Sequence, residues 1–139
     1  MTDPEETART PEETVRAVLD GVCRVSTGDA SALDEVQELY ADILHPMHPE
    51  IPPIRTREDL LRHFAVLRDR MTSLPTSRAA VDVRVHTTTD PEVVVTEFRY
   101  WTVVDGNTLI TPCIWVTRVR DGRIVEGRDH NGRSAPMSQ

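Results

Sequence analysis

Two Asp-Gly pairs constrain the fold of this chain more than any other sequence feature. They are Asp105-Gly106 and Asp121-Gly122, and each stands between β-rich runs at residues 93–104, 109–120 and 123–130. Asp-Gly favours two-residue hairpin turns, because both turn positions need a positive φ. The three runs are therefore predicted to pair in succession as an antiparallel sheet.

The residues before these runs predict three helices and one further strand. Thr10-Pro11-Glu12-Glu13 is typical of a capped helix start, Asp29 or Ser31 begins a second helix, and Thr56 with Asp59 caps a third. The proline-rich segment 45–53 excludes a long helix or a central strand. From residue 78 the valines at 81, 83 and 85 alternate with polar residues, as in a half-buried strand. Helices followed by antiparallel strands predict an α+β fold with three helices packed on one face of a curved sheet.

A length of 139 residues corresponds to about one domain. We expect that domain to span residues 11–132. It is preceded by a disordered acidic tail, residues 1–10, and followed by a flexible tail, residues 133–139.

Composition excludes several function classes. All 16 basic residues are arginine, so a lysine Schiff base, a pyridoxal phosphate anchor and a P-loop lysine are absent. The net charge of −7 argues against a non-specific nucleic-acid binder. No apolar run approaches a membrane span, and Cys23 and Cys113 fit reduced core residues of a cytoplasmic protein.

Two-residue turns would also fix which strand residues share a face. Glu97 would pair with Ile114, and Ile114 with Asp129, and paired residues point the same way. One face would then carry Val93, Val95, Glu97, Arg99, Trp101, Ile110, Ile114, Val116, Val125, Gly127 and Asp129. The other would carry Phe98, Tyr100, Cys113, Trp115, Val119, Ile124, Glu126 and His130. A one-residue bulge would reverse this assignment beyond the bulge.

The order of elements, with the stretches 39–42, 57–60 and above all 112–130, resembles the SnoaL-like branch of the nuclear transport factor 2-like superfamily. The resemblance covers roughly residues 11–132. It implies a cone of sheet and helices around an apolar pocket, commonly dimeric through the outer sheet face. Activities in this superfamily include polyketide cyclisation, ketosteroid isomerisation, dehydration and epoxide hydrolysis, so the fold does not choose among them.

Ketosteroid isomerase machinery is largely missing from the chain. The aspartate base that precedes a proline in those enzymes matches His45 before Pro46, or His48 before Pro49. The oxyanion tyrosine of their first helix falls near Gly21, and their second oxyanion acid falls on Ile114 or Trp115.

Epoxide hydrolases and cyclases of the superfamily match the end of the chain better. The catalytic Arg-Asp-Tyr run of limonene epoxide hydrolase resembles Arg128-Asp129-His130. The Arg-x-Asp pair of that enzyme corresponds to Glu97-Phe98-Arg99, in which the acid and the arginine have exchanged places. The Tyr-x-Asn motif of that enzyme has no counterpart before Ile51. SnoaL-type cyclases use an aspartate and a histidine, for which Asp129 and either His45 or His48 are candidates.

These matches predict a proton-transfer site without a cofactor or a metal. We expect Asp129, His45, Glu97 and Arg99 to be catalytic, because one acid could take a proton while another gives one. We expect His48, Trp101, Ile114 and Tyr40 to contact an apolar small-molecule substrate. The partner prediction is a homodimer formed through the outer sheet face.

Each of these interpretations has an alternative. Glu97 and Arg99 could form a solvent-exposed ion pair, and Asp129 could lie at the end of a strand on the surface. His45 and His48 could lie in an exposed loop. The chain could accordingly be a cyclase, isomerase, dehydratase or epoxide hydrolase of specialised metabolism. It could instead be a non-catalytic binding or accessory protein, or a dimerisation module with a filled cone.

Overall fold

The computed structural model describes residues 8–29, 31–41, 43–47, 54–72 and 76–137. Side-chain surroundings are described for these residues except 43–47, 67, 68, 70–72 and 76. In chain order the elements are α1 (Pro11–Ser26), α2 (Ala32–Glu38), β1 (Ile43–Met47), β2 (Ile54–Thr56), α3 (Arg57–Thr72), β3 (Thr76–Thr87), β4 (Val93–Val104), β5 (Asn107–Arg120), β6 (Arg123–Asn131) and β7 (Ala135–Pro136).

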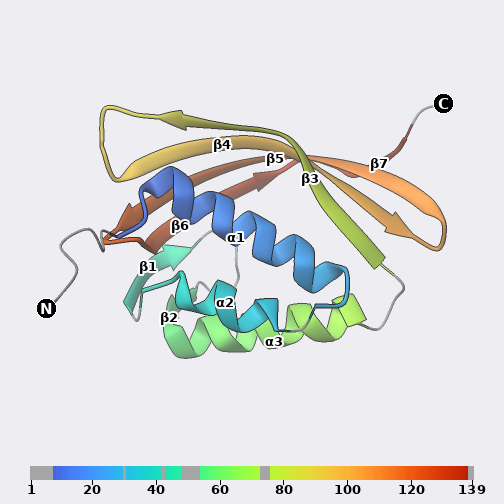
Figure 1. Cartoon of the computed structure of the whole chain (residues 1–139), viewed down its shortest axis with the longest axis horizontal. Helices are drawn as coiled ribbons and strands as arrows, with labels where there is room; N and C mark the ends of the chain where they lie inside the picture. The colour runs from blue at the N-terminus through green and yellow to red at the C-terminus, as the bar shows by residue number, and fades with distance from the viewer. Residues whose placement is uncertain (1–7, 30, 42, 48–53, 73–75, 138–139) are drawn as a thin grey trace, which may run out of the picture.

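A curved antiparallel sheet and three helices form the two layers (Figure 1). The main sheet has the strand order β3-β4-β5-β6, with β7 paired to β5, and β1 pairs with β2 in a small second sheet. Helix α1 contacts β3, β4 and β5 of the main sheet as well as α2 and α3. Strand β1 contacts β6. The predicted α+β fold, with helices on one sheet face, is confirmed.

Local capping signals set where the long helices begin. At α1, Thr10 Oγ1 accepts a hydrogen bond from the Glu13 backbone N–H (3.2 Å), and the Glu13 carboxylate accepts one from the Thr10 N–H (3.0 Å). At α3, Thr56 Oγ1 accepts from the Asp59 N–H (3.1 Å). Both predicted caps are confirmed. Each satisfies backbone donors that a helix end leaves unpaired.

Both Asp-Gly turns adopt the backbone that the sequence predicts. Asp105 and Gly106 have φ values of 49° and 78°, and Asp121 and Gly122 have 53° and 75°. The β4–β5 register follows the two-residue turn throughout, so Glu97 pairs with Ile114. This part of the predicted register is confirmed.

The β5–β6 register departs from the prediction within a few residues of its turn. Val119 pairs with Ile124, but Arg118 pairs with Glu126, so Val125 is an extra residue in β6. This β-bulge exchanges the two faces beyond it. As a result Asp129 pairs with Trp115, and Ile114 pairs with His130. The predicted pairing of Ile114 with Asp129 is wrong for this reason.

Two short pairings lie outside the predicted strands. In the proline-rich segment, β1 contains Pro46 and pairs with β2 in a two-stranded sheet, where the missing proline N–H can be tolerated. In the stretch predicted as a flexible tail, β7 pairs with β5, and the Met137 N–H donates to the Thr108 carbonyl (3.0 Å). Residues 1–7 of the predicted N-terminal tail lie outside the described residues.

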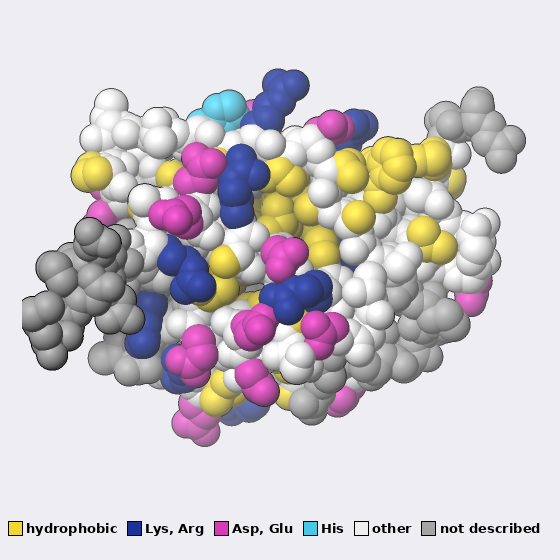
Figure 2. All heavy atoms as spheres, viewed as in Figure 1, with side chains coloured by type: hydrophobic (Ala, Val, Ile, Leu, Met, Phe, Trp, Pro, Cys, Tyr) yellow, Lys and Arg dark blue, Asp and Glu magenta, His cyan; other side chains and the backbone are white. Residues whose placement is uncertain are grey.

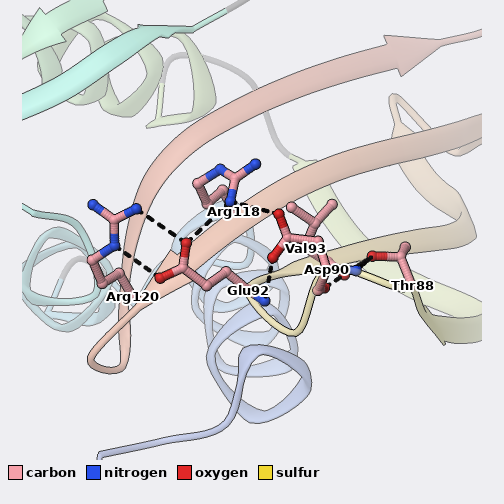
Figure 3. Close-up of polar contacts among 6 residues, drawn as sticks. All are labelled: Thr88, Asp90, Glu92, Val93, Arg118 and Arg120. Carbon is pink, nitrogen blue, oxygen red and sulfur yellow. Dashed lines mark hydrogen bonds and ion pairs between the residues drawn. The ribbon is translucent and has the colours of Figure 1, made fainter.

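An ion-pair network ties the β3–β4 turn to the end of β5 (Figure 3). Glu92 accepts hydrogen bonds from Arg118 (3.0 Å) and from two nitrogens of Arg120 (2.8 and 3.0 Å). Arg118 also pairs with Asp90 at 2.9 Å. These arginines lower the pKa of Glu92 to about 2, Arg120 contributing most. The network therefore keeps Glu92 ionised well below neutral pH.

Both cysteines are free thiols, as the sequence predicts. Burial raises the pKa of Cys23, and burial followed by the charge of Asp129 raises that of Cys113 to about 11. Both side chains therefore stay protonated at neutral pH. No helix among the described residues is long and apolar enough to cross a membrane.

Candidate functional site

A cavity of about 230 Å³ lies between the inner face of the main sheet and the helices. Its apolar wall comes mainly from α1, β2, α3 and β6: Val15, Val18, Val22, Ile54, Leu60, Phe64 and Ile124. Its remaining lining residues are Tyr40, His63, Arg78, Tyr100, Trp115, Thr117, Gly127, Asp129 and Asn131. An apolar pocket with a few converging polar groups is the usual form of a small-molecule site.

Asp129 enters this cavity because of the bulge at Val125. The extra residue turns Asp129 to the inner face, where Trp115 is its neighbour across the β5–β6 pairing. Thr117 and Gly127, two pairs further along and on the same face, line the cavity too. Asp129 is half-buried. Asp129, the residue that the family resemblance selects, therefore lines the cavity through a β5–β6 register other than the predicted one.

Tyr40 is held against β6 by the backbone. Its neighbours Leu39 and Ala41 exchange hydrogen bonds with Ile124 (2.8 and 2.9 Å), which forms a single parallel bridge between Tyr40 and Ile124. The ring packs edge-on against Phe64, with 5.7 Å between centroids. Burial, together with the charge of Asp129, raises the pKa of Tyr40. Its hydroxyl is therefore a hydrogen-bond donor at every pH near neutrality.

Tyr100 lines the cavity from β4. Its ring packs edge-on against Phe98, with 4.9 Å between centroids. Burial is the main cause that raises its pKa well above the usual value, and the negative charge of Asp129 adds to the shift. Two protonated phenols and a carboxylate thus line one cavity. This set could bind a carbonyl oxygen and move a neighbouring proton.

Glu97 and Arg99 lie on the outer face of the sheet, away from Asp129. Glu97 pairs with His86 at 2.6 Å, and Arg99 pairs with Asp82, so each has its own exposed partner. The prediction of a cluster of Glu97, Arg99 and Asp129 on one face is wrong, because the bulge turns only Asp129 inward. The open hollow that Glu97 and Arg99 line on the outer face also contains His130.

Two of the predicted substrate contacts share that outer face. The side chains of Trp101 and Ile114 are 39 % and 43 % exposed and do not line the cavity. Tyr40, in contrast, lines the cavity. The side chain of His45 in β1 and the whole of His48 lie outside the described residues.

Sequence reasoning missed several cavity residues. The register without a bulge places Tyr100 and Trp115 on the face opposite Asp129, and the sequence patterns predict no role for Arg78 or His63. The signal that could have found the two aromatic residues is the adjacent apolar pair Ile124-Val125, since two consecutive apolar residues are compatible with a bulge. His63 packs beside Phe64 in α3, with 5.8 Å between ring centroids.

The described residues contain no group of three or more His, Cys, Asp or Glu side chains that could hold a metal ion. The polar groups of the cavity are instead hydroxyls, a carboxylate, an amide, an imidazole and a guanidinium. These groups can transfer protons and donate hydrogen bonds.

Comparison with known proteins identifies the family. The SnoaL-like domain matches residues 15–127. The chain belongs to the SnoaL-like family. This family assignment agrees with the three helices and the curved antiparallel sheet described above.

Solved structures of similar fold include a provisionally named polyketide cyclase from Xanthomonas campestris, at 18 % identity and a TM-score of 0.65. That match covers 86 % of this chain and 87 % of the other. A second provisionally named polyketide cyclase, from Pseudomonas putida, has 16 % identity and a TM-score of 0.63, with 88 % and 92 % covered.

A provisionally named isomerase from Bacillus subtilis has 20 % identity and a TM-score of 0.67, with 88 % of this chain and 86 % of the other covered. At these identities the likeness concerns the fold alone. No curated protein matches the chain significantly.

Proposed function

We propose that this SnoaL-like protein is an enzyme that moves protons on an apolar small molecule without a cofactor, as in cyclisation or isomerisation. The observation that supports it is Asp129, which the bulge at Val125 turns into an apolar cavity shared with Tyr40 and Tyr100. The cavity volume of about 230 Å³ favours a compact substrate. Pockets for drug-sized ligands are typically larger, roughly 300–1,000 Å³.

In this proposal Asp129 is the general base. Its carboxylate takes a proton from a carbon next to a substrate carbonyl, and the C–H electron pair moves to form an enolate. Tyr40 and Tyr100 donate hydrogen bonds to the carbonyl oxygen, which stabilises the charge that develops there. Protonated Asp129 then returns the proton to another carbon of a conjugated enolate, or the enolate carbon attacks an internal carbonyl carbon to close a ring and the resulting alkoxide takes the proton from Asp129. Glu97 and Arg99 have no part in these steps.

A related use of the same site is epoxide hydrolysis or dehydration. Asp129 would then activate water or take the proton that accompanies loss of water. The non-catalytic alternative is a binding protein that uses the same cavity for recognition alone. Turnover of a simple enolisable ketone separates proton transfer from binding.

The test is exchange of α-protons for deuterium in 2-tetralone, 1-indanone and cyclohexanone, followed by NMR in D2O. We expect the wild-type protein to accelerate exchange of at least one ketone above buffer. Asp129→Asn should reduce that acceleration by roughly 10²-fold or more, the usual contribution of a general base. Tyr40→Phe and Tyr100→Phe should each reduce it by a smaller factor.

The matched control is Asp105→Asn, which makes the same change in an exposed turn where asparagine tolerates positive φ. It should leave exchange unchanged. If no ketone exchanges faster than in buffer, or if Asp129→Asn retains full acceleration, the proposal is wrong and the binding-protein alternative is favoured.

A further inference from the structure

Among the residues that the structure describes, Arg78 is the half-buried arginine that forms no ion pair with a carboxylate. Arg24, Arg57 and Arg118 are also half-buried, and each forms an ion pair with at least one acidic side chain. Within the part of the chain that the structure describes, no ion pair joins Arg78 to an acid. A partly desolvated guanidinium without a counter-charge is costly to keep, so its position calls for another explanation.

Neutral contacts hold the Arg78 side chain in place. Its Nε donates a hydrogen bond to Thr102 Oγ1 (3.2 Å), directly across the β3–β4 pairing. Its guanidinium carbon lies 4.7 Å from the centroid of the Tyr100 ring, within cation–π range. Both contacts fix the plane of the guanidinium. Neither uses the donors on its two terminal nitrogens.

Arg78 lines the same cavity as Asp129 but from the other edge of the sheet. In the order β3-β4-β5-β6, Arg78 comes from the first strand and Asp129 from the last. Tyr100 on β4 and Trp115 on β5 lie between them. The cavity therefore has a cationic side and an anionic side, separated by aromatic rings.

We infer that Arg78 is the anchor for a carboxylate on the ligand of this cavity. The terminal donors of a guanidinium form a planar fork that matches the two oxygens of a carboxylate. The ligand class is thus an apolar organic acid, whose carboxylate lies at β3 and whose apolar body extends toward Asp129. This inference deepens the proposed function, because it names the group that would orient a substrate against the base.

Binding can be measured without turnover, because Trp115 lines the cavity. The chain has two tryptophans, and the other, Trp101, is exposed on the outer face. A Trp101→Phe background therefore leaves Trp115 as the single fluorescent reporter. The probes are adamantane-1-carboxylate and adamantane-1-carboxamide, which share a compact apolar body and differ in charge.

We expect the carboxylate to bind at least about tenfold more tightly than the amide, as a charge-assisted hydrogen-bonded pair warrants. Arg78→Met should remove this preference, weakening carboxylate binding at least tenfold and changing amide binding less than about threefold. Arg78→Lys keeps the charge without the fork and should fall between these values. The matched control is Arg84→Met, the same change at an exposed position of β3, which should bind both probes like the parent.

Three results would overturn the inference. They are the absence of saturable carboxylate binding, equal affinity of the parent for both probes, and equal weakening of both probes by Arg78→Met. Near-ultraviolet circular dichroism shows whether Arg78→Met keeps the native packing of its aromatic side chains. If this variant is misfolded, the probe affinities of Arg78→Lys test the inference instead. Binding of adamantane-1-carboxylate needs no proton transfer, and the exchanging ketones carry no carboxylate, so a failure of ketone exchange and a failure of this anchor are distinguishable.

Discussion

Trp115 and Asp129 are cross-strand neighbours on the inner face of the sheet, and both line the cavity. Thr96 on β4 continues the same row, because it pairs with Trp115 on its other side. Within the described residues, the indole Nε1 of Trp115 and the hydroxyl of Thr96 have no hydrogen-bond partner. A row with a carboxylate at its end and two unpaired polar atoms is unusual in a protein interior. The unpaired indole N–H of Trp115 is therefore a donor that a bound ligand could use.

The two tyrosines of the chain should resist ionisation in the folded protein. The chain has only two, Tyr40 and Tyr100, and burial raises the pKa of both. A native sample should therefore show little phenolate absorbance at about pH 10–11, where unfolded tyrosine titrates. Absorbance at 295 nm across an alkaline titration measures this. The same sample in guanidinium chloride supplies the full amplitude.

The sign of the linked stability change follows from the raised pKa values. The folded state favours neutral tyrosine, so the free energy of unfolding should fall as pH rises above the unfolded value of about 10. Tyr40→Phe and Tyr100→Phe should each remove half of the denatured amplitude. Appearance of half the phenolate signal near pH 10 in the native protein would show that one ring is accessible to solvent.

Glu92 should make the protein sensitive to acid. Hydrogen bonds from Arg120 and Arg118 lower its folded-state pKa from the usual 4.5 to about 2. A lowered carboxyl pKa contributes stability above the unfolded value, and this contribution is lost as pH falls through the folded value. We therefore expect the free energy of unfolding to decrease between about pH 5 and pH 2. Urea unfolding at a series of pH values measures the decrease.

Glu92→Gln should flatten that dependence, because glutamine does not titrate. Asp90, whose pKa is lowered by the Glu92 backbone N–H and by Arg118, should leave a smaller residual slope. Glu58→Gln is the matched control, an exposed glutamate in the first turn of α3. Equal acid sensitivity of Glu92→Gln and the wild-type protein would contradict the role given to this network.

A side chain at Gly21 should destabilise the folded protein, because α1 and α2 pack against each other at this position. A Cβ added at Gly21 would collide with Cγ2 of Val36, which is 1 % exposed. Gly21→Ala should therefore lower the free energy of unfolding by about 1–3 kcal/mol through overpacking. Chemical unfolding gives this value. The double variant Gly21→Ala/Val36→Ala should be less destabilised than the sum of its two single variants.

Short-range signals account for what the sequence could predict. The Thr10 and Thr56 caps and both Asp-Gly turns depend on residues within four positions, so the pattern fixes them. The sequence does not decide whether β6 has a bulge at Val125, because either register of β6 buries apolar residues. The choice between the registers depends on packing of β6 against β1 and Tyr40, which are distant in sequence. Arg78 was missed for a similar reason. Its contacts, Tyr100 and Thr102, are distant in sequence and meet it only through the β3–β4 pairing.

The outer face of the sheet is the surface from which we predict self-association. Trp101, Val103 and Ile114 point to this face and are 39 %, 36 % and 43 % exposed. Exposed apolar side chains of this size on one sheet face are typical of an interface, and the pairs Arg99–Asp82 and Glu97–His86 would form its polar rim.

We expect a homodimer in sedimentation equilibrium, and a shift to monomer in Trp101→Ser/Ile114→Ser. Val66→Ser, at an exposed apolar position on α3, is the control and should stay dimeric. Because Trp101 and Ile114 lie outside the cavity, the monomeric variant should bind adamantane-1-carboxylate as the parent does. A wild-type monomer at high micromolar concentration would contradict the predicted dimer, whereas a double variant that remains dimeric would place the interface elsewhere.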